Sequence, residues 1–223
     1  MPTDTPPRRN WHLNRWLIVF IVATLGWSGW RAYAFRSALA ETKALGWKLY
    51  YTDPVETIRA NWKSAFKKET WLDGVTGVVI PTSEAFEQNL AIVHRLNPVR
   101  LRINKATTLR DLSALKPFTR LQQLVIEGPT ELTNVDALKN LSALQQVWLS
   151  GCTGLTNVDA LKNHSALQEV TLIGCTGLPN LDGLKNLSAL RVIQLSGCTG
   201  LTKETVAALK AALPTGIIIC DYP

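Results

Sequence analysis

The strongest pattern in the sequence is a set of apolar positions that recurs every 23 residues towards the C-terminus. Units that begin at Leu121, Leu144 and Leu167 follow one another without a gap, and a fourth begins at Leu190 before it diverges. Counted from that leucine, positions 1, 4, 6, 9, 12, 15, 18 and 21 are apolar or cysteine. Consecutive repeats of one length indicate a solenoid, in which each unit covers the hydrophobic face of the next.

The spacing inside a unit predicts how its chain runs. Positions 4 and 6 lie two residues apart, which predicts a short strand with one buried face. The later spacing of three predicts a tight helical or 3-10 return. Stacked units would therefore form a parallel sheet on one side and helical turns on the other. Residues 98–120 fit the same frame, and residues 75–97 fit it at their strand.

The repeated motif Leu-x-x-Val/Leu-x-Leu-x-x-Cys-x-x-Leu resembles that of the leucine-rich repeat family. The resemblance covers residues 98–213 well and residues 75–97 loosely. It implies an α/β solenoid with parallel strands on a concave face and short helices or 3-10 turns on a convex face. It also implies recognition of a protein partner on the concave face, and no enzymatic activity. The layout as a whole resembles bacterial proteins in which a membrane helix and a small α/β cap precede such an array.

Several recurring residues are interpreted as structural. Position 9 is a cysteine in three units, and the family places there a buried Asn or Cys whose polar group turns to the backbone; these are Cys152, Cys175 and Cys198. A threonine hydroxyl at position 10 can satisfy backbone groups at the turn, in Thr107, Thr130, Thr153, Thr176 and Thr199. Glycine at position 11 permits a positive φ, in Gly154, Gly177 and Gly200.

Charged and substituted positions in the returning turn are also interpreted as structural. Aspartate and lysine lie three residues apart and should form exposed ion pairs, in Asp136/Lys139, Asp159/Lys162 and Asp182/Lys185. His164 replaces the leucine of position 21, which predicts a half-buried imidazole. Cys220 follows three isoleucines, and we expect it to join the core of a last strand.

An apolar segment near the N-terminus raises the question of a membrane. Residues 16–35 contain one charge, Arg31, and carry tryptophans at both ends. Because a spanning helix needs about 20 residues, a single-pass anchor is one interpretation. A cleaved signal peptide is a second, since Ala32-Tyr33-Ala34 fits an A-x-A cleavage site, and a docking or core helix is a third. The short basic tail before the segment favours a cytoplasmic N-terminus, with the repeats outside.

The segments flanking the repeats predict caps. Residues 47–51 and 75–80 alternate like strands. Asp53 and Pro54 predict the start of a helix that runs to about residue 71, and Ser83 is expected to cap a helix over residues 84–96. A helix over residues 203–213 and a strand over residues 217–220 would close the far end.

These elements give five predicted parts. They are a basic tail (1–15), a transmembrane or signal-anchor helix (16–35), an α/β capping region (36–97), the leucine-rich repeats (98–213) and a C-terminal capping strand (214–223).

The outward strand positions 3, 5 and 7 contain the candidate binding residues. Trp148 falls in the middle of this face, with apolar neighbours and a rim of Gln, Glu and Arg, as in protein-binding hot spots. Two arginines at the N-terminal side could pair with a carboxylate. The alternative is that the indole simply packs flat over its neighbours. The candidate partner-binding residues are Arg100, Arg102, Val125, Trp148, Thr171 and Ile173.

Composition narrows the class of function without naming a partner. The chain has 223 residues and a formal net charge of +7, of which residues 98–223 contribute 12 − 9 = +3, without a stripe that would suit nucleic acid. None of the hydrolase, nucleotide-binding or zinc-protease motifs occurs, and three scattered histidines suggest no metal site. We therefore expect no cofactor, no metal and no small-molecule substrate.

The resulting hypothesis is a non-enzymatic, membrane-tethered repeat module that binds a protein through its concave face. Two alternatives stay open: a cytoplasmic scaffold or cytoskeletal-filament accessory protein, of the type that accompanies bacterial tubulins, and an exported protein with a cleaved signal peptide. The side of the membrane on which the repeats lie would separate these classes.

Overall fold

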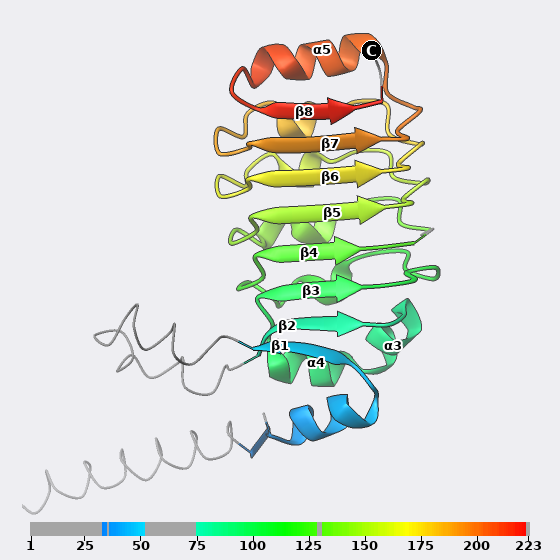
Figure 1. The fold of residues 1–223 in the computed structure, drawn as a ribbon, viewed down its shortest axis with the longest axis vertical. Helices are drawn as coiled ribbons and strands as arrows, with labels where there is room; N and C mark the ends of the chain where they lie inside the picture. The colour runs from blue at the N-terminus through cyan, green and yellow to red at the C-terminus, as the bar shows by residue number, and fades with distance from the viewer. Residues whose placement is uncertain (1–32, 35, 52–74, 129–130, 222–223) are drawn as a thin grey trace, which may run out of the picture.

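The computed structural model describes residues 33–34, 36–51, 75–128 and 131–221. Its centre is one eight-stranded sheet whose strands follow one another in sequence order, β1 to β8 (Figure 1). The strands are β1 (Lys48–Tyr51), β2 (Val75–Ile80), β3 (Arg100–Ile103), β4 (Gln123–Ile126), β5 (Gln146–Ser150), β6 (Glu169–Ile173), β7 (Val192–Ser196) and β8 (Ile217–Cys220).

The register of the sheet repeats the period of the sequence. β1 runs antiparallel to β2, and every later pair is parallel. Residue Gly77 aligns with Arg100, Arg100 with Gln123, and Gln123 with Gln146, each a step of 23 residues. The predicted parallel sheet is therefore confirmed, and β2 already belongs to it in the repeat register.

The core lies between the sheet and the returning turns. Positions 4 and 6 of the strands point into it, and in β4 to β7 all of them are completely or almost completely buried: Leu124, Ile126, Val147, Leu149, Val170, Leu172, Ile193 and Leu195. The leucines of positions 1, 12 and 18 form further buried ladders behind them. One continuous apolar core thus runs along the whole stack, as the spacing predicts.

The returns are short 3-10 helices on the side of the core opposite the sheet. They are η1 (Ser113–Leu115), η2 (Asp136–Asn140), η3 (Asp159–Leu161) and η4 (Asp182–Leu184). An asparagine two residues before η2, η3 and η4 accepts a hydrogen bond from the backbone N–H of the first helical residue; the asparagines are Asn134, Asn157 and Asn180. Two of the three expected ion pairs form, Lys139–Asp136 and Lys185–Asp182.

The N-terminal side of the stack differs from the repeats in having longer helices. Residues 36–44 are helical and end at a left-handed Gly46. The ion pair between Arg95 and Glu41 (2.7 Å) ties this helix to α4 (Leu90–Leu96). The hydrogen bond from Arg95 holds the pKa of the Glu41 carboxyl below its usual range.

The expected helix over residues 84–96 is divided in two. Asn89 separates α3 (Ser83–Gln88) from α4. The cap is Thr82, whose hydroxyl accepts from the N–H of Ala85, and not Ser83, whose buried hydroxyl contacts Thr108 across 25 residues. The prediction failed here because both residues are hydroxylic and only the backbone conformation of Thr82 suits a cap.

The C-terminal end closes the stack as expected. α5 (Lys203–Ala212) buries Val206 and Leu209, and it replaces the 3-10 turn of the earlier units. In β5 and β6 the N–H that follows the strand donates to a carbonyl of the next unit, as in Gly151 to Ile173. The next strand after β7 is β8, and there the N–H of Gly197 donates to the side-chain carboxylate of Asp221, which directly follows β8, at 2.6 Å. The Asp221 side chain therefore takes the place of the backbone acceptor used in the earlier units.

The glycines show two different requirements, and the prediction assigned one of them to the wrong position. Positive φ occurs at position 8, in Gly128, Gly151, Gly174 and Gly197, directly after each strand. The glycines of position 11 do not have positive φ. A Cβ on Gly177 would lie 2.4 Å from the carbonyl oxygen of Thr153, so this residue must be small because successive units approach closely.

Two side-chain predictions also need correction. His164 is fully buried rather than half-buried, with Nε2 at 2.9 Å from the Leu138 carbonyl oxygen and Nδ1 at 3.2 Å from that of Leu161. The position-10 threonines that the structure describes are exposed and their hydroxyls make no hydrogen bond. Three of these are Thr107, Thr153 and Thr176; the predicted role of Thr130 lies outside the described residues.

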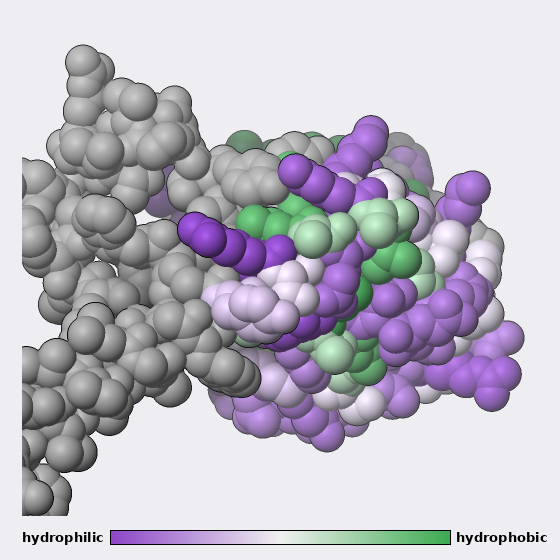
Figure 2. All heavy atoms as spheres, turned by 90° about the horizontal axis from the view of Figure 1, so that it is seen from below, coloured by the Kyte–Doolittle hydropathy of each residue, from purple (hydrophilic) through white to green (hydrophobic). Residues whose placement is uncertain are grey.

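The predicted anchor over residues 16–35, apart from residues 33–34, and the predicted helix over 53–71 also fall outside the described residues. Within the part of the chain that is described, no helix combines the length and apolar character needed to cross a membrane. Figure 2 views the β1 end of the stack, where hydrophobic side chains gather near the middle and hydrophilic ones surround them.

Gly177 and Gly154 occupy the same position in adjacent units and provide a matched test of the stacking. Gly177→Ala should lower the free energy of unfolding by about 1–3 kcal/mol, because its Cβ would overlap a backbone oxygen. Gly154→Ala should be tolerated, since its Cβ would lie 3.5 Å from the nearest atom, an ordinary contact. Urea unfolding of both variants measures the difference. Equal losses at the two sites would mean that the units do not approach as described.

Candidate functional site

The candidate site lies on the open face of the sheet, which we define as the strand side chains turned away from the core, at positions 3, 5 and 7. β-Pairing places Trp148 directly between Val125 and Thr171 on this face. Val125 is 5% exposed and Thr171 4% exposed, although neither points into the core. Trp148 itself is half-buried. The indole and its two neighbours therefore form a small packed cluster on an otherwise polar face.

The indole of Trp148 has an unusual polar environment. Its Nε1 atom is buried and has no hydrogen-bond partner among the described residues. A buried donor without an acceptor costs about 1–3 kcal/mol, so such atoms are rare in folded proteins. The observation marks Trp148 as a residue whose environment is not optimised for the stability of the isolated chain.

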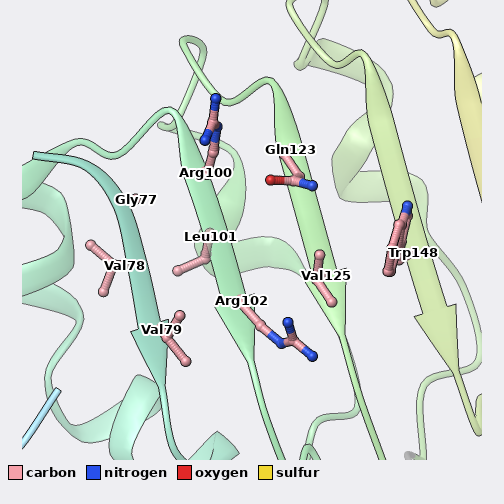
Figure 3. A pocket seen from close by; sticks show the side chains of 9 residues that line it. All are labelled: Gly77, Val78, Val79, Arg100, Leu101, Arg102, Gln123, Val125 and Trp148. Carbon is pink, nitrogen blue, oxygen red and sulfur yellow. The ribbon is translucent and has the colours of Figure 1, made fainter. Parts of the chain in front are cut away.

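A shallow hollow lies beside this cluster, between β2 and β5 (Figure 3). Its volume is about 190 Å³, which is small compared with the roughly 300–1,000 Å³ of drug-sized ligand sites. Polar and apolar side chains both line it. The lining residues are Gly77, Val78, Val79, Arg100, Leu101, Arg102, Gln123, Val125 and Trp148.

The two arginines of the hollow differ in their partners. Arg102 forms an ion pair with Glu127, which directly follows β4, and its Nε donates to the Asn104 side chain at 3.1 Å. Arg100 is exposed and forms no ion pair with any residue in the described ranges. Among the residues that the structure describes, Arg102 is therefore already paired, and Arg100 is the arginine of the hollow that has no carboxylate partner.

A row of amide side chains crosses the same face at position 3. Gln123 Nε2 donates to Gln146 Oε1 at 2.8 Å, and Gln146 Nε2 donates to the Glu169 carboxylate at 3.0 Å. Because an ionised carboxylate can only accept, Glu169 fixes the orientation of both amides. The carbonyl oxygen of Gln123 is consequently turned toward Arg100, as Figure 3 shows.

The structure brings together four of the six predicted binding residues. Arg100, Arg102, Val125 and Trp148 line one hollow. Thr171 is buried within the cluster beside Trp148 and does not line the hollow, and Ile173, which is 38% exposed, lies outside it at the far end of β6. The sequence analysis did not select Val79, Gln123 or Glu127 as site residues. The repeat spacing could have identified them, because residues 23 or 25 apart in the sequence are neighbours in adjacent coils.

The cysteine ladder is separate from this site and lies in the core. Cys152, Cys175 and Cys198 are buried and form no disulfide. The thiol of Cys198 donates to the Leu172 carbonyl oxygen at 3.2 Å, and that of Cys175 to Leu149 at 3.7 Å. The pKa of the Cys175 thiol is raised, chiefly by hydrogen bonds with the flanking thiols of Cys152 and Cys198 and, to a smaller extent, by burial. In the described ranges no three His, Cys, Asp or Glu residues form a group that could hold a metal ion.

The geometry defines the class of fold. Parallel strands in a 23-residue register, 3-10 returns and ladders of buried leucines form a leucine-rich-repeat solenoid, as the sequence motif predicts.

Solved structures similar to the chain are bacterial leucine-rich-repeat proteins. Internalin C2 from Listeria monocytogenes has 23% sequence identity and a TM-score of 0.43, over 75% of this chain and 83% of that one. A leucine-rich-repeat protein from Leptospira interrogans has 14% identity and a TM-score of 0.41, over 57% of this chain and 38% of that one. No protein-family model matches the sequence, and no curated protein matches it.

The burial of the thiol ladder predicts an order of chemical labelling. Cys220 is only partly buried, so N-ethylmaleimide should modify it first in the native chain. Cys152, Cys175 and Cys198 should react only after denaturation, because they are inaccessible and Cys175 stays protonated. Intact-mass measurement should show one adduct in the native chain and four in urea. Rapid native labelling at a ladder cysteine would contradict its placement in the core.

Proposed function

We propose that the chain is a non-enzymatic protein-binding module that uses the open face of its sheet. The observation that carries this proposal is the hollow beside Trp148. Aromatic residues in a partly desolvated setting, next to arginine and rimmed by polar groups, are the usual composition of protein-binding hot spots. The rigid sheet holds these side chains in fixed positions before any partner arrives, which reduces the entropic cost of binding.

Under this proposal, the residues that bind the partner and the residues that stabilise the fold lie on opposite faces of the same strand. Trp148 faces outward, and Leu149, the next residue, is completely buried. Leu149→Ala should lower the free energy of unfolding by about 2–5 kcal/mol, because it leaves a cavity in the core. Trp148→Ala should unfold at nearly the wild-type temperature but weaken partner binding by more than about 1 kcal/mol.

Site-directed photocrosslinking in expressing cells measures that binding. A benzoylphenylalanine introduced at Ser150, on the open face, should give partner adducts that Trp148→Ala reduces about fivefold or more. The same group at Asn163, on the opposite side of the solenoid, provides the control. Adducts that form equally from Asn163, or that do not depend on Trp148, would refute the proposed face.

We also propose that residues 16–35 anchor this module to a membrane. The support is the length and composition of the segment, which carries a single charge. The full chain should then remain in the membrane fraction after carbonate extraction, whereas a chain that begins at residue 33 should be released. N-terminal sequencing of the purified chain distinguishes the alternative. A mature N-terminus just after Ala34 would identify a cleaved signal peptide instead of an anchor.

A further inference from the structure

We propose that the hollow on the open face recognises an extended segment of a partner protein in which an acidic residue lies two or three positions from an apolar one. This inference rests on the proposed function and specifies the chemistry of the partner. Three features of the hollow support it: an available cation, an acceptor of fixed orientation, and an apolar recess of the size of one side chain.

The cation is Arg100. Its guanidinium is exposed and makes no ion pair within the described ranges, whereas Arg102 is already bound to Glu127 and Asn104. A free guanidinium at the rim of a recess matches a carboxylate in both charge and fork geometry. The acidic residue of the partner is therefore assigned to Arg100.

The acceptor is the side-chain carbonyl of Gln123. The Gln146 amide donates to the Glu169 carboxylate, and the Gln123 amide donates to the Gln146 side-chain carbonyl. The side-chain oxygen of Gln123 is therefore turned toward Arg100. It is placed to accept a backbone N–H from the residue whose carboxylate binds Arg100. A donor and an acceptor side by side favour a peptide over a free anion, which could satisfy only the donor.

The apolar recess is the part of the hollow beside Val125 and Trp148, and Arg102 separates it from Val79 on β2. The whole hollow measures about 190 Å³, so it is too small for an ordinary drug-sized ligand, and its apolar part suits one side chain. The strand spacing of about 4.8 Å separates Arg100 on β3 from Trp148 on β5 by roughly two strands. An extended segment rises about 3.3 Å per residue, so a segment lying across the strands would span that separation with residues two or three positions apart.

The surrounding charges disfavour a polyanion as the occupant. Arg100 and Arg102 share this part of the face with Glu127 and Glu169, two positive and two negative groups. A nucleic acid or an anionic membrane gains affinity from many cations in one patch. A partner with one acidic residue meets a single available guanidinium and avoids the two glutamates.

Selection from a random peptide-display library on the immobilised full chain tests the proposal. Wild-type chain should enrich peptides with Asp or Glu two or three positions from an aromatic or branched aliphatic residue. Arg100→Glu should weaken the best of these peptides about tenfold or more and, in a fresh selection, should enrich Lys or Arg instead. Arg110→Glu makes the same charge change at an exposed residue off the sheet and should leave affinity unchanged.

The outcomes separate this inference from the proposed function. Peptides that require Trp148 but show no acidic residue, or that bind Arg100→Glu unchanged, would overturn the inference and leave the binding face intact. Peptides that are indifferent to Trp148→Ala, or no enrichment by the wild-type chain, would overturn both. Anionic phosphatidylserine vesicles that bind the wild-type chain and not Arg100→Glu would assign the cation to lipid and likewise refute the inference.

Discussion

The stacking of identical coils is the constraint on which the rest of the structure depends. A single coil of 23 residues cannot bury its own leucines, so each one is stable only against its neighbours. Stacking fixes the strand register, and the register sets which side chains become neighbours across coils. Gly177 shows how tight this fit is, since a single added carbon would overlap the backbone of the preceding coil. Asp221 shows the same constraint at the end, where its carboxylate, directly after β8, takes the place of the backbone carbonyl that accepts in the earlier units.

The same register creates the candidate binding surface. Positions that the core does not use are aligned in rows on the open face, so substitutions there change recognition with little effect on folding. The row at position 5 varies from Arg102 through Val125 and Trp148 to Thr171, although the buried positions beside it scarcely vary. The repeat thus separates a nearly invariant supporting face from a variable one.

Sequence periodicity predicted the solenoid, its strands and its outward positions because each depends on local spacing. It did not predict features that depend on distances between coils. The two kinds of glycine differ only in whether the backbone turns left-handed or a neighbouring coil approaches, as in Gly174 and Gly177. The pairing of Arg102 with Glu127 and the burial of Thr171 beside Trp148 are likewise contacts between coils. Such contacts become predictable only when residues about 23 apart are treated as neighbours.

Hydrogen–deuterium exchange of the full chain, with and without a bound partner peptide, tests the central claim most directly. If the open face is the binding surface, the peptide should slow exchange in β3, β4 and β5 and in the residues that directly follow them. The 3-10 turns η1, η2 and η3 on the opposite side should exchange at unchanged rates. Protection confined to those turns, with the strands unaffected, would contradict the account.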